Sequence, residues 1–388
     1  MADIPQHATG RPSFGAWITR LAASRRFQAF AARVPGLRAI SRAEGAAIFD
    51  VVQGFVRSQT LVALVELRLL HRLSEGPSTA EALAPGCGVP VARLQILLQS
   101  GAAIGLLRRR RDGAFALTLR GASILGVPGL DAMIRHHRAF YADMADPVAL
   151  LRGPDKTELA QFWPYVFGAE GARDPEVTAT YSDLMAQSQT LVAEDTLRLV
   201  DFSKVSRLMD VGGGTGAFLT AVGQACDRPQ LDLFDLPVVV GGATARFAKA
   251  GLTARCTIHP GSFRDDPLPK GADAISLIRV LYDHDDSTVA RLLSAVFAAL
   301  PAGGRLVISE PMSGGAAPDP ITDVYFAFYT LAMQTGRTRS LAEISGLLAA
   351  AGFVNIKFHW GFRPYVTSVV TAERAVGSGN DLKSVNLV

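Results

Sequence analysis

The stretch Asp210-Val211-Gly212-Gly213-Gly214-Thr215-Gly216 decides the fold, because it follows a short apolar run and precedes a helix-like stretch at 218–226. Glycines at a strand-to-helix turn let the main chain come close to a ligand, and the ligands of open α/β sheets bind at such turns. A tight turn that holds no ligand is the alternative. Since Gly212-x-Gly214-x-x-Ala217 also satisfies the dinucleotide pattern, the turn alone leaves the ligand open.

Strand-like and helix-like stretches alternate on both sides of this turn. The apolar runs of strand length are 205–211, 231–234, 274–277 and 305–309, and the helix-like stretches are 218–226, 243–250 and 287–300. This alternation is typical of βαβ units. The sequence therefore predicts an α/β fold with a doubly wound, mostly parallel sheet.

Two acidic residues narrow the choice of ligand. Asp235 ends the second run in Phe234-Asp235-Leu236-Pro237, where a carboxylate can accept hydrogen bonds from the hydroxyls of a ribose. That feature suits both NAD and S-adenosylmethionine. Asp210 directly precedes the glycines, where it would repel a pyrophosphate but tolerate a sulfonium and an ammonium. We therefore predict S-adenosylmethionine, with an NAD-dependent oxidoreductase as an alternative.

Residues 47–127 predict a small, mainly helical domain of the winged-helix type. Apolar residues 62–73 form a stripe on one helix, Thr79 is placed to cap a second, and Pro85-Gly86 is expected to end it. A third helix follows through 94–103, and then Asp112-Gly113 predicts a hairpin between two short strands.

The run Arg108–Arg111 lies in this hairpin and could contact DNA phosphates. The third helix, where side chains that read bases would lie, has only Arg93 as a cation. We interpret the run as charge that protects an exposed strand edge, and we predict no nucleic-acid partner. A winged-helix regulator that senses a ligand stays an alternative, testable by salt-dependent duplex binding.

Hydrophobic residues make up 49% of the 388-residue chain and charged residues 19%, which excludes global disorder and allows two compact domains. No apolar run approaches the roughly 18 residues that a membrane span needs, and the N-terminus has no signal-peptide pattern. The three scattered cysteines, Cys87, Cys226 and Cys256, suit a reducing compartment. We expect a cytoplasmic protein.

The basic excess belongs to residues 1–46, an arm with seven arginines against Asp3 and Glu44, whereas the net charge of the whole chain is +4. Apolar residues between these arginines predict a basic amphipathic helix, which can lie on an anionic membrane surface. Peripheral association with a membrane is therefore one expectation. Packing of the arm on its own body or on a partner subunit is the other.

Residues 128–195 are rich in aromatic residues and predict helices that wall a substrate pocket, with ordinary helix packing as the alternative. The adjacent His136 and His137 would face different ways on a helix, and we predict no metal site. The candidate pocket residues, including two from the segment 321–334, are Phe140, Trp163, Tyr165, Tyr181, Met185, Tyr325 and Tyr329.

On these motifs the sequence resembles the O-methyltransferases that carry a winged-helix dimerisation domain. The resemblance covers roughly 47–372 and rests on residues 210–216, 234–237, Gly261-Ser262-Phe263, Asp273, 279–286 and Ala351-Gly352-Phe353. It implies a Rossmann-like class I methyltransferase domain over 196–372, a tail at 373–388, a homodimer, and S-adenosylhomocysteine as the product. The cofactor residues that it implies, together with Asp210, are Gly212, Gly214, Asp235, Leu236, Ser262, Phe263 and Arg279.

The catalytic string departs from that family. The family has His as general base, but here the string reads Leu281-Tyr282-Asp283-His284-Asp285-Asp286, and Thr338 stands where a supporting Glu is expected. A phenol of pKa about 10 replaces an imidazole of about 6.5, so Tyr282 is better suited to orient the acceptor than to deprotonate it. The candidates for catalysis are Tyr282, Asp283 and His284, with weak or water-assisted base help to an in-line transfer.

This string, together with residues 140–147 and 162–167, looks most like the carotenoid-pathway members of purple phototrophic bacteria. That resemblance implies methylation of the tertiary 1-hydroxyl of an acyclic hydroxycarotenoid, in carotenoid biosynthesis for photosynthesis. If the acceptor is dissolved in the intracytoplasmic membrane, binding of the arm to that membrane would bring the enzyme to its substrate. Another hydrophobic acceptor, such as a bacteriochlorophyll intermediate, a quinone or a polyketide, stays open.

Overall fold

The computed structural model describes residues 14–162 and 175–376, with the side chains of Phe14 and of 175–184 excepted. Contacts divide the chain into an N-terminal unit, Met1–Ser123, and a C-terminal unit, Ile124–Val388. The predicted finer boundaries within these units stay predictions. Trp163 and Tyr165 lie outside the described residues, and so does the side chain of Tyr181.

The globular part of the N-terminal unit has the predicted order of helices followed by a hairpin. Its elements are α4 (Gly54–Glu66), α5 (Leu69–Ser74), α6 (Ala80–Cys87), α7 (Val91–Ala103), β1 (Leu107–Arg109), β2 (Phe115–Leu117) and α8 (Leu119–Leu125). The side chain of Thr79 accepts a hydrogen bond from the Ala82 amide, which confirms the predicted cap. Arg110 pairs with Asp112 at 3.3 Å in the exposed hairpin.

Two local predictions in this unit were wrong. The stripe over 62–73 is not one helix, because Arg68 adopts a left-handed conformation with φ of 53° and separates α4 from α5. Pro85 does not end α6 but lies inside it, and the helix ends at Cys87, followed by the capping residue Gly88 with φ of 64°. Glycine reaches this conformation without the steric cost that other residues meet.

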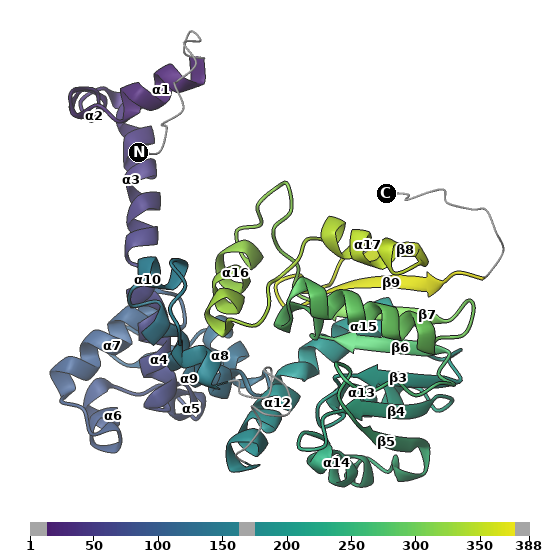
Figure 1. Ribbon diagram of the computed structural model, residues 1–388. Coiled ribbons are helices and arrows are strands. Elements are labelled where there is room, and N and C mark those ends of the chain that lie inside the picture. The colour runs from purple at the N-terminus through teal and green to yellow at the C-terminus, as the bar shows by residue number, and fades with distance from the viewer. Residues whose placement is uncertain (1–13, 163–174, 377–388) are drawn as a thin grey trace. The chain divides into compact units, whose positions relative to one another are not determined.

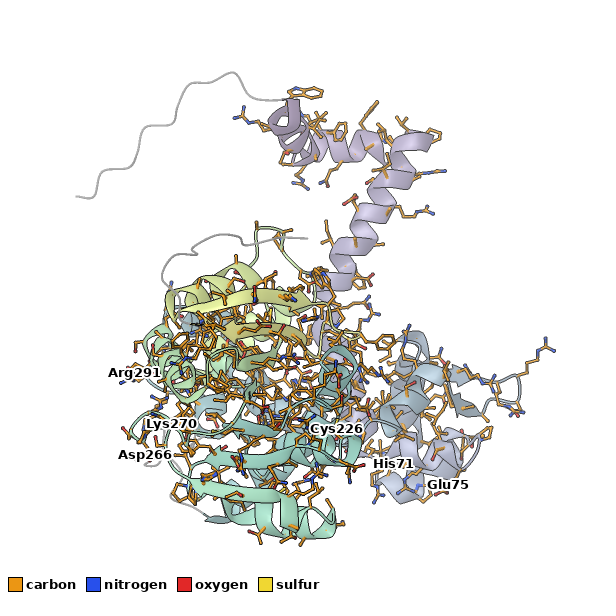
Figure 2. All side chains as sticks on the ribbon, turned by 90° about the vertical axis from the view of Figure 1, so that its right-hand side faces the viewer. His71, Glu75, Cys226, Asp266, Lys270 and Arg291 are labelled. Carbon is orange, nitrogen blue, oxygen red and sulfur yellow. The ribbon has the colours of Figure 1, made fainter. Side chains whose placement is uncertain are left out.

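From residue 14 on, where the structure describes the arm, it forms three helices rather than the single amphipathic helix expected from its pattern. They are α1 (Phe14–Ala22), α2 (Arg25–Ala31) and α3 (Pro35–Val52). No side chain of α3 is buried, and the side chains of the arm project outward around the helices (Figure 2). Among the described residues no single helix could cross a membrane, although α3 and α4, bent by 49°, pass that test together by length and composition.

The C-terminal unit is built on a seven-stranded sheet of order β5-β4-β3-β6-β7-β9-β8 (Figure 1). The first five strands in that order pair in parallel, and the last two pairings are antiparallel. This confirms the predicted mostly parallel sheet. The strands are β3 (Arg207–Val211), β4 (Gln230–Asp235), β5 (Cys256–Pro260), β6 (Ala274–Ile278), β7 (Arg305–Glu310), β8 (Phe353–His359) and β9 (Ser368–Arg374).

Helices cover both faces of this sheet, because its central strands are apolar on both sides. One core contains residues of α15 (Asp286–Ala299) and α17 (Leu341–Ala350), packed on side chains such as Met209 and Ile275. The other contains α12 (Pro175–Leu199), α13 (Ala217–Ala225) and α14 (Ala243–Lys249), packed on Leu208 and Leu231. Consecutive residues of β3 thus enter opposite cores, as strand geometry requires.

The remaining helices of the C-terminal unit bring distant segments together. They are α9 (Leu130–Asp143), α10 (Pro147–Leu151), α11 (Glu158–Phe162) and α16 (Thr322–Met333), and α16 contacts the three others. The side chains that pack together where these helices meet include Phe140, Phe162, Met185, Tyr325 and Tyr329, and we call them the aromatic cluster.

Candidate functional site

A hollow lies at the carboxyl ends of four neighbouring parallel strands, β3, β4, β5 and β6, which is the edge where α/β sheets bind ligands. It is lined by Gly212, Asp235, Leu236, Gly261, Ser262, Phe263, Arg264, Arg279, Val280, Asp283 and His284. Eight of the predicted site residues are therefore together. Gly212 has φ of 71°, and a Cβ there would lie 2.9 Å from Val280, so glycine is required at this point of the rim.

Asp235 is fixed by the main chain around it. Its carboxylate accepts hydrogen bonds from the amides of Gly214 and Leu236, each at 2.7 Å. Burial raises the pKa of Asp235 to about 6, against the lowering effect of these two amides. Each oxygen keeps a further lone pair. The carboxylate can therefore accept two hydroxyls of a ribose in the hollow.

Asp210 lies beneath the glycine turn rather than among the residues that line the hollow. It is fully buried, and its Oδ1 accepts a hydrogen bond from Ser276 at 2.6 Å. Oδ2 has no hydrogen-bond partner in the described residues, and a Cβ on Gly213 would lie 2.4 Å from it. Burial raises the pKa of Asp210 to about 7. Its contact with a cationic ligand stays a prediction.

Ser262, one of the residues that line the hollow, has acidic groups close by. Its hydroxyl donates to Asp265 at 2.9 Å, and its amide donates to Asp266 at 2.8 Å. Asp266 belongs to the loop after β5 and is labelled in Figure 2. The two carboxylates that follow Ser262 are thus hydrogen-bonded to it at the rim of the hollow.

Tyr282 and Arg279 form one hydrogen-bonded pair at the start of the catalytic string. Nε of Arg279 donates to Oη of Tyr282 at 3.1 Å, and its NH1 donates to Ser188 of α12 at 2.9 Å. Burial raises the pKa of Tyr282, and the guanidinium only partly opposes that rise. The phenol is therefore kept neutral, which agrees with the expectation that it orients rather than deprotonates.

His284 is buried at the hollow and is not available as a base in its present hydrogen bonding. The Arg264 guanidinium donates to its Nδ1 at 3.0 Å. In a neutral ring the proton then resides on Nε2, which leaves no lone pair there. Burial lowers the pKa of His284 to about 4, and Arg264 adds to this. The ring also contacts Phe263 edge-on, with centroids 5.2 Å apart, so it shapes the hollow.

Two buried residues form hydrogen bonds to the backbone of the catalytic string, and the sequence analysis predicted neither of them. Glu310, at the end of β7, accepts a hydrogen bond from the Leu281 amide at 3.0 Å. Arg339 is wholly buried and donates to the carbonyl oxygens of Leu281 and His284, each at 2.8 Å. A carboxylate at the end of a buried parallel strand was a usable signal for Glu310. Arg339 gave none.

Asp283, the third candidate for catalysis, lines the hollow. Burial raises the pKa of Asp283 to about 7, while the Arg279 guanidinium lowers it. Its Oδ1 has no hydrogen-bond partner among the described residues. The carboxylate is therefore placed to take part in a proton transfer near neutral pH.

The described candidates for a substrate pocket do come together, in the aromatic cluster. The ring centroid of Phe140 lies 6.1 Å from that of Tyr325 and 5.4 Å from that of Tyr329. Met185 packs against the same cluster. Whether these residues touch an acceptor stays a prediction.

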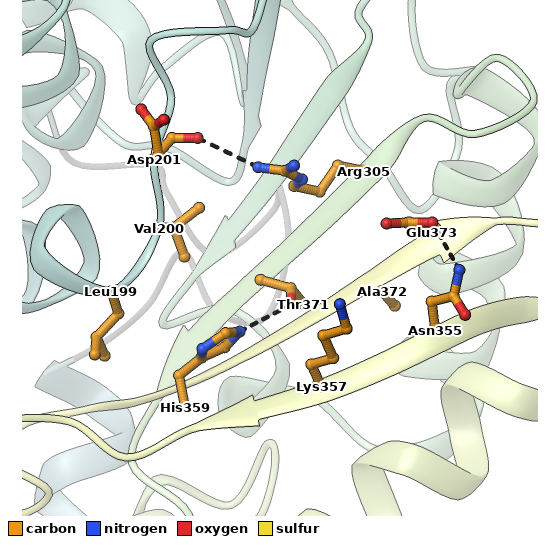
Figure 3. Close-up of a pocket in the computed structure, with 10 residues that line it drawn as sticks. All are labelled: Leu199, Val200, Asp201, Arg305, Asn355, Lys357, His359, Thr371, Ala372 and Glu373. Atoms are coloured by element: carbon orange, nitrogen blue, oxygen red, sulfur yellow. Dashed lines mark hydrogen bonds between the residues drawn. The ribbon is translucent and has the colours of Figure 1, made fainter. Parts of the chain in front are cut away.

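A second hollow, of about 180 Å³, lies over β7, β8 and β9 and contains none of the predicted site residues (Figure 3). Its polar groups are largely paired with one another. His359 is hydrogen-bonded to Thr371, Asn355 donates to Glu373, and Arg305 donates to the carbonyl oxygen of Asp201. Within the described ranges no group of three or more metal-binding side chains occurs.

Comparisons with known proteins agree with this arrangement. The family of O-methyltransferase domains matches residues 141–354, and an O-methyltransferase dimerisation domain matches residues 49–125. The demethylspheroidene O-methyltransferase of Cereibacter sphaeroides is 63% identical over 355 residues, covering 92% of this chain and 94% of the relative. The enzyme of the same name from Rhodobacter capsulatus is 50% identical over 370 residues, covering 95% and 92%.

Solved structures share the fold. The mitomycin 7-O-methyltransferase has a TM-score of 0.73 and 26% identity, covering 87% of this chain and all of that one. The SAH-bound methyltransferase of calicheamicin biosynthesis has a TM-score of 0.70 and 27% identity, covering 86% and 98%. The family match spans more than half of the chain, and the relatives cover nearly all of it. This chain therefore belongs to the O-methyltransferase family, and it carries that family's dimerisation domain.

Proposed function

We propose that this protein transfers the methyl group of S-adenosylmethionine to the hydroxyl of demethylspheroidene, or of a closely similar hydroxycarotenoid. The observation that carries the proposal is the 63% identity to a demethylspheroidene O-methyltransferase over 92% of the chain. The family match favours this function over the regulator and the NAD-dependent oxidoreductase, since neither belongs to that family.

The residues of the hollow suit such a cofactor. Asp235 would accept the ribose hydroxyls, Gly212 and Gly214 would allow the main chain to approach the methionine part, and Phe263 would contact the adenine. The cofactor supplies an activated methyl group on a sulfonium. The protein then has to hold the acceptor oxygen in line with it, which can lower the barrier by about 7–11 kcal/mol. Arg279 lines the hollow and is hydrogen-bonded to Tyr282, whose turn contacts α16 of the aromatic cluster, and this pair would orient that acceptor.

The test uses purified protein with methyl-labelled S-adenosylmethionine and separate acceptors. We expect label in demethylspheroidene and little in a bacteriochlorophyll intermediate, a quinone or a phenolic polyketide. Preferential labelling of the tetrapyrrole would replace the carotenoid assignment. Absence of transfer to every acceptor, with folded protein that binds S-adenosylhomocysteine, would withdraw it.

We also propose that the protein is a homodimer, in keeping with its dimerisation domain. Exposed apolar side chains near the junction of α3 and α4, including Phe49, Val52 and Phe55, support this. Light scattering over a range of concentrations tests it. A mass of one 41.2 kDa chain at every concentration would contradict the dimer.

Finally, we propose that α1 and α2 hold the protein on an anionic membrane surface from the cytoplasmic side. Ile18 and Phe30 are exposed there, and Arg25 and Arg26 lie between them. A carotenoid acceptor dissolves in lipid, so such docking brings the enzyme to its substrate. Sedimentation with vesicles tests this, and we expect binding to phosphatidylglycerol vesicles that salt weakens. Equal binding to neutral vesicles, or none to either, would contradict it.

A further inference from the structure

Two histidine–tyrosine pairs join α9 to α16 within the aromatic cluster. Nε2 of His137 lies 2.6 Å from Oη of Tyr325, and Nε2 of His136 lies 2.8 Å from Oη of Tyr329. The two tyrosine rings stack, with centroids 5.5 Å apart. Burying the polar groups of these pairs costs desolvation free energy, which apolar side chains at the same positions would not. Packing of the two helices alone therefore does not explain the pairs.

The hydrogen bonds determine where the proton of His137 resides. Its Nδ1 lies 2.6 Å from the carbonyl oxygen of Met133, which can only accept. Nδ1 is therefore protonated in the neutral ring, and Nε2 has a free lone pair. It follows that Tyr325 donates its hydroxyl proton to Nε2. An imidazolium formed by full transfer of that proton would keep its hydrogen bond to Met133 and be stabilised by it.

Tyr325 is close to the residues that border the cofactor hollow. The helix α16 packs against the turn Leu281–Asp283 that carries Tyr282. Burial raises the pKa of the Tyr325 hydroxyl, and the nearby Arg279 guanidinium opposes that rise. Arg279 itself lines the hollow. The helix that carries Tyr325 and the cofactor hollow thus share the turn Leu281–Asp283, whose Asp283 lines the hollow.

The catalytic string offers no equivalent nitrogen. Oη of Tyr282 accepts from Arg279, and Nε2 of His284 carries the ring proton because Nδ1 accepts from Arg264. Asp283 is the rival acceptor, since its carboxylate lines the hollow. Unlike Asp283, the ring of His137 is already hydrogen-bonded to a hydroxyl that can relay a proton.

We propose that Tyr325 and His137 together take the proton that the acceptor hydroxyl loses during methyl transfer. As the acceptor oxygen bonds to the methyl carbon, the sulfur–methyl bond breaks and its electron pair stays on sulfur. The acceptor proton passes to Oη of Tyr325 while the Tyr325 proton passes to Nε2 of His137. The positive charge of the sulfonium is thereby replaced by that of an imidazolium. This inference rests on the proposed function, because it requires a hydroxyl acceptor.

The first test needs no turnover. Nitrogen-15 NMR of labelled histidine in the wild-type protein reports which ring nitrogen carries the proton, with His137→Gln identifying its signal among the seven histidines. We expect His137 to be protonated on Nδ1, and we expect Tyr325→Phe to shift the Nε2 signal. Protonation on Nε2 instead would overturn the proposal, since Tyr325 could not then donate. This readout also stands if the proposed acceptor is wrong.

The second test is kinetic. Tyr325→Phe and His137→Gln should each lower kcat about 100-fold at saturating cofactor and acceptor, the usual contribution of a general base, and leave S-adenosylhomocysteine affinity within twofold. In the wild type kcat should fall at acid pH as His137 becomes protonated, and this limb should vanish in His137→Gln. Among the residues that the structure describes, the titratable or charged groups around His137 are His136, Tyr141, Tyr325 and Tyr329, with Arg279 beside Tyr325.

His136→Gln is the matched control, because it alters the neighbouring pair on the same two helices. It should retain the acid limb whatever its effect on stability. If both test variants keep kcat within threefold of wild type, the pair is not the proton acceptor. The proposal is equally overturned if Asp283→Asn removes the acid limb while His137→Gln retains it. Failure of wild-type protein to methylate any hydroxycarotenoid would instead contradict the proposed function.

Discussion

The guanidinium of Arg339 donates a hydrogen bond to the carbonyl oxygen of His284 at 2.8 Å, although the two residues are 55 positions apart. A second bond to Leu281 and contacts of 2.7–2.9 Å with Asp286 fix the same stretch of chain. The position of the catalytic string is therefore set by a side chain that does not line the hollow.

Arg339→Met should lower the free energy of unfolding by about 2–4 kcal/mol, because two buried carbonyl groups lose their donor. Arg337 is the control, since it pairs with the same Asp286 at 3.1 Å but is about half exposed. Arg337→Met should cost under about 1 kcal/mol. Urea unfolding measures both. Equal losses would mean that the buried hydrogen bonds of Arg339 contribute little.

Asp235→Ala should weaken binding of S-adenosylmethionine by about 1–3 kcal/mol, the cost of hydrogen bonds lost in a buried site. Isothermal calorimetry measures the dissociation constant directly. Asp232→Asn serves as control, because Asp232 lies on the same strand but pairs with Arg207 at 3.1 Å. It should leave that constant unchanged. An unchanged constant in Asp235→Ala would refute its role at the ribose.

The pH dependence of stability should report Glu310. Burial raises its pKa to about 8, against the opposing effect of Arg339. A carboxyl whose pKa is raised on folding stabilises the protein below its unfolded pKa of about 4.5, and that contribution is lost as the pH rises through 8. We expect the thermal midpoint of the cofactor-free wild type to fall relative to Glu310→Gln between pH 5 and pH 9. A constant difference would show that Glu310 is ionised throughout.

Tyr282→Phe should lower kcat about tenfold or more, since Arg279 loses an acceptor worth roughly 1.5–3 kcal/mol for a charged donor. Cofactor affinity should change less. His284→Ala, by contrast, should mainly weaken cofactor binding, because the ring packs against Phe263 in the hollow. Steady-state kinetics with calorimetry separate these effects. A larger loss of kcat in His284→Ala than in Tyr282→Phe would reverse the two roles.

Local signals predicted much of the fold. The glycine turn, the four central strands, the Thr79 cap and the hairpin all depend on neighbouring residues, and each formed as expected. The strand β5 was missed because several of its side chains are only half-buried, which leaves no continuous apolar run. The prediction of a single helix over 62–73 was wrong, because the periodicity of apolar residues does not indicate that Arg68 adopts a left-handed conformation.

The cofactor side of the site could be predicted, because its residues follow consecutive strands whose ends must meet. The acceptor side could not. His137 and Tyr325 are 188 positions apart, and only the packing of α9 on α16 makes them neighbours. The sequence places His136 and His137 in an aromatic-rich helical segment and makes them an improbable metal pair, but it pairs neither of them with a tyrosine. Their hydrogen bonds to tyrosines form only in the tertiary structure, so residue spacing in the sequence cannot predict them.

The helix α3 runs for 18 residues without one buried side chain. Helices in water owe most of their stability to packing, so this segment gains little from the chain that carries it. The folding of α3 is thus linked to the binding of the second subunit or of the membrane surface proposed above. On dilution, or in the absence of lipid, residues 35–52 should melt well before the sheet does, which makes their helicity a gauge of whether the enzyme is assembled.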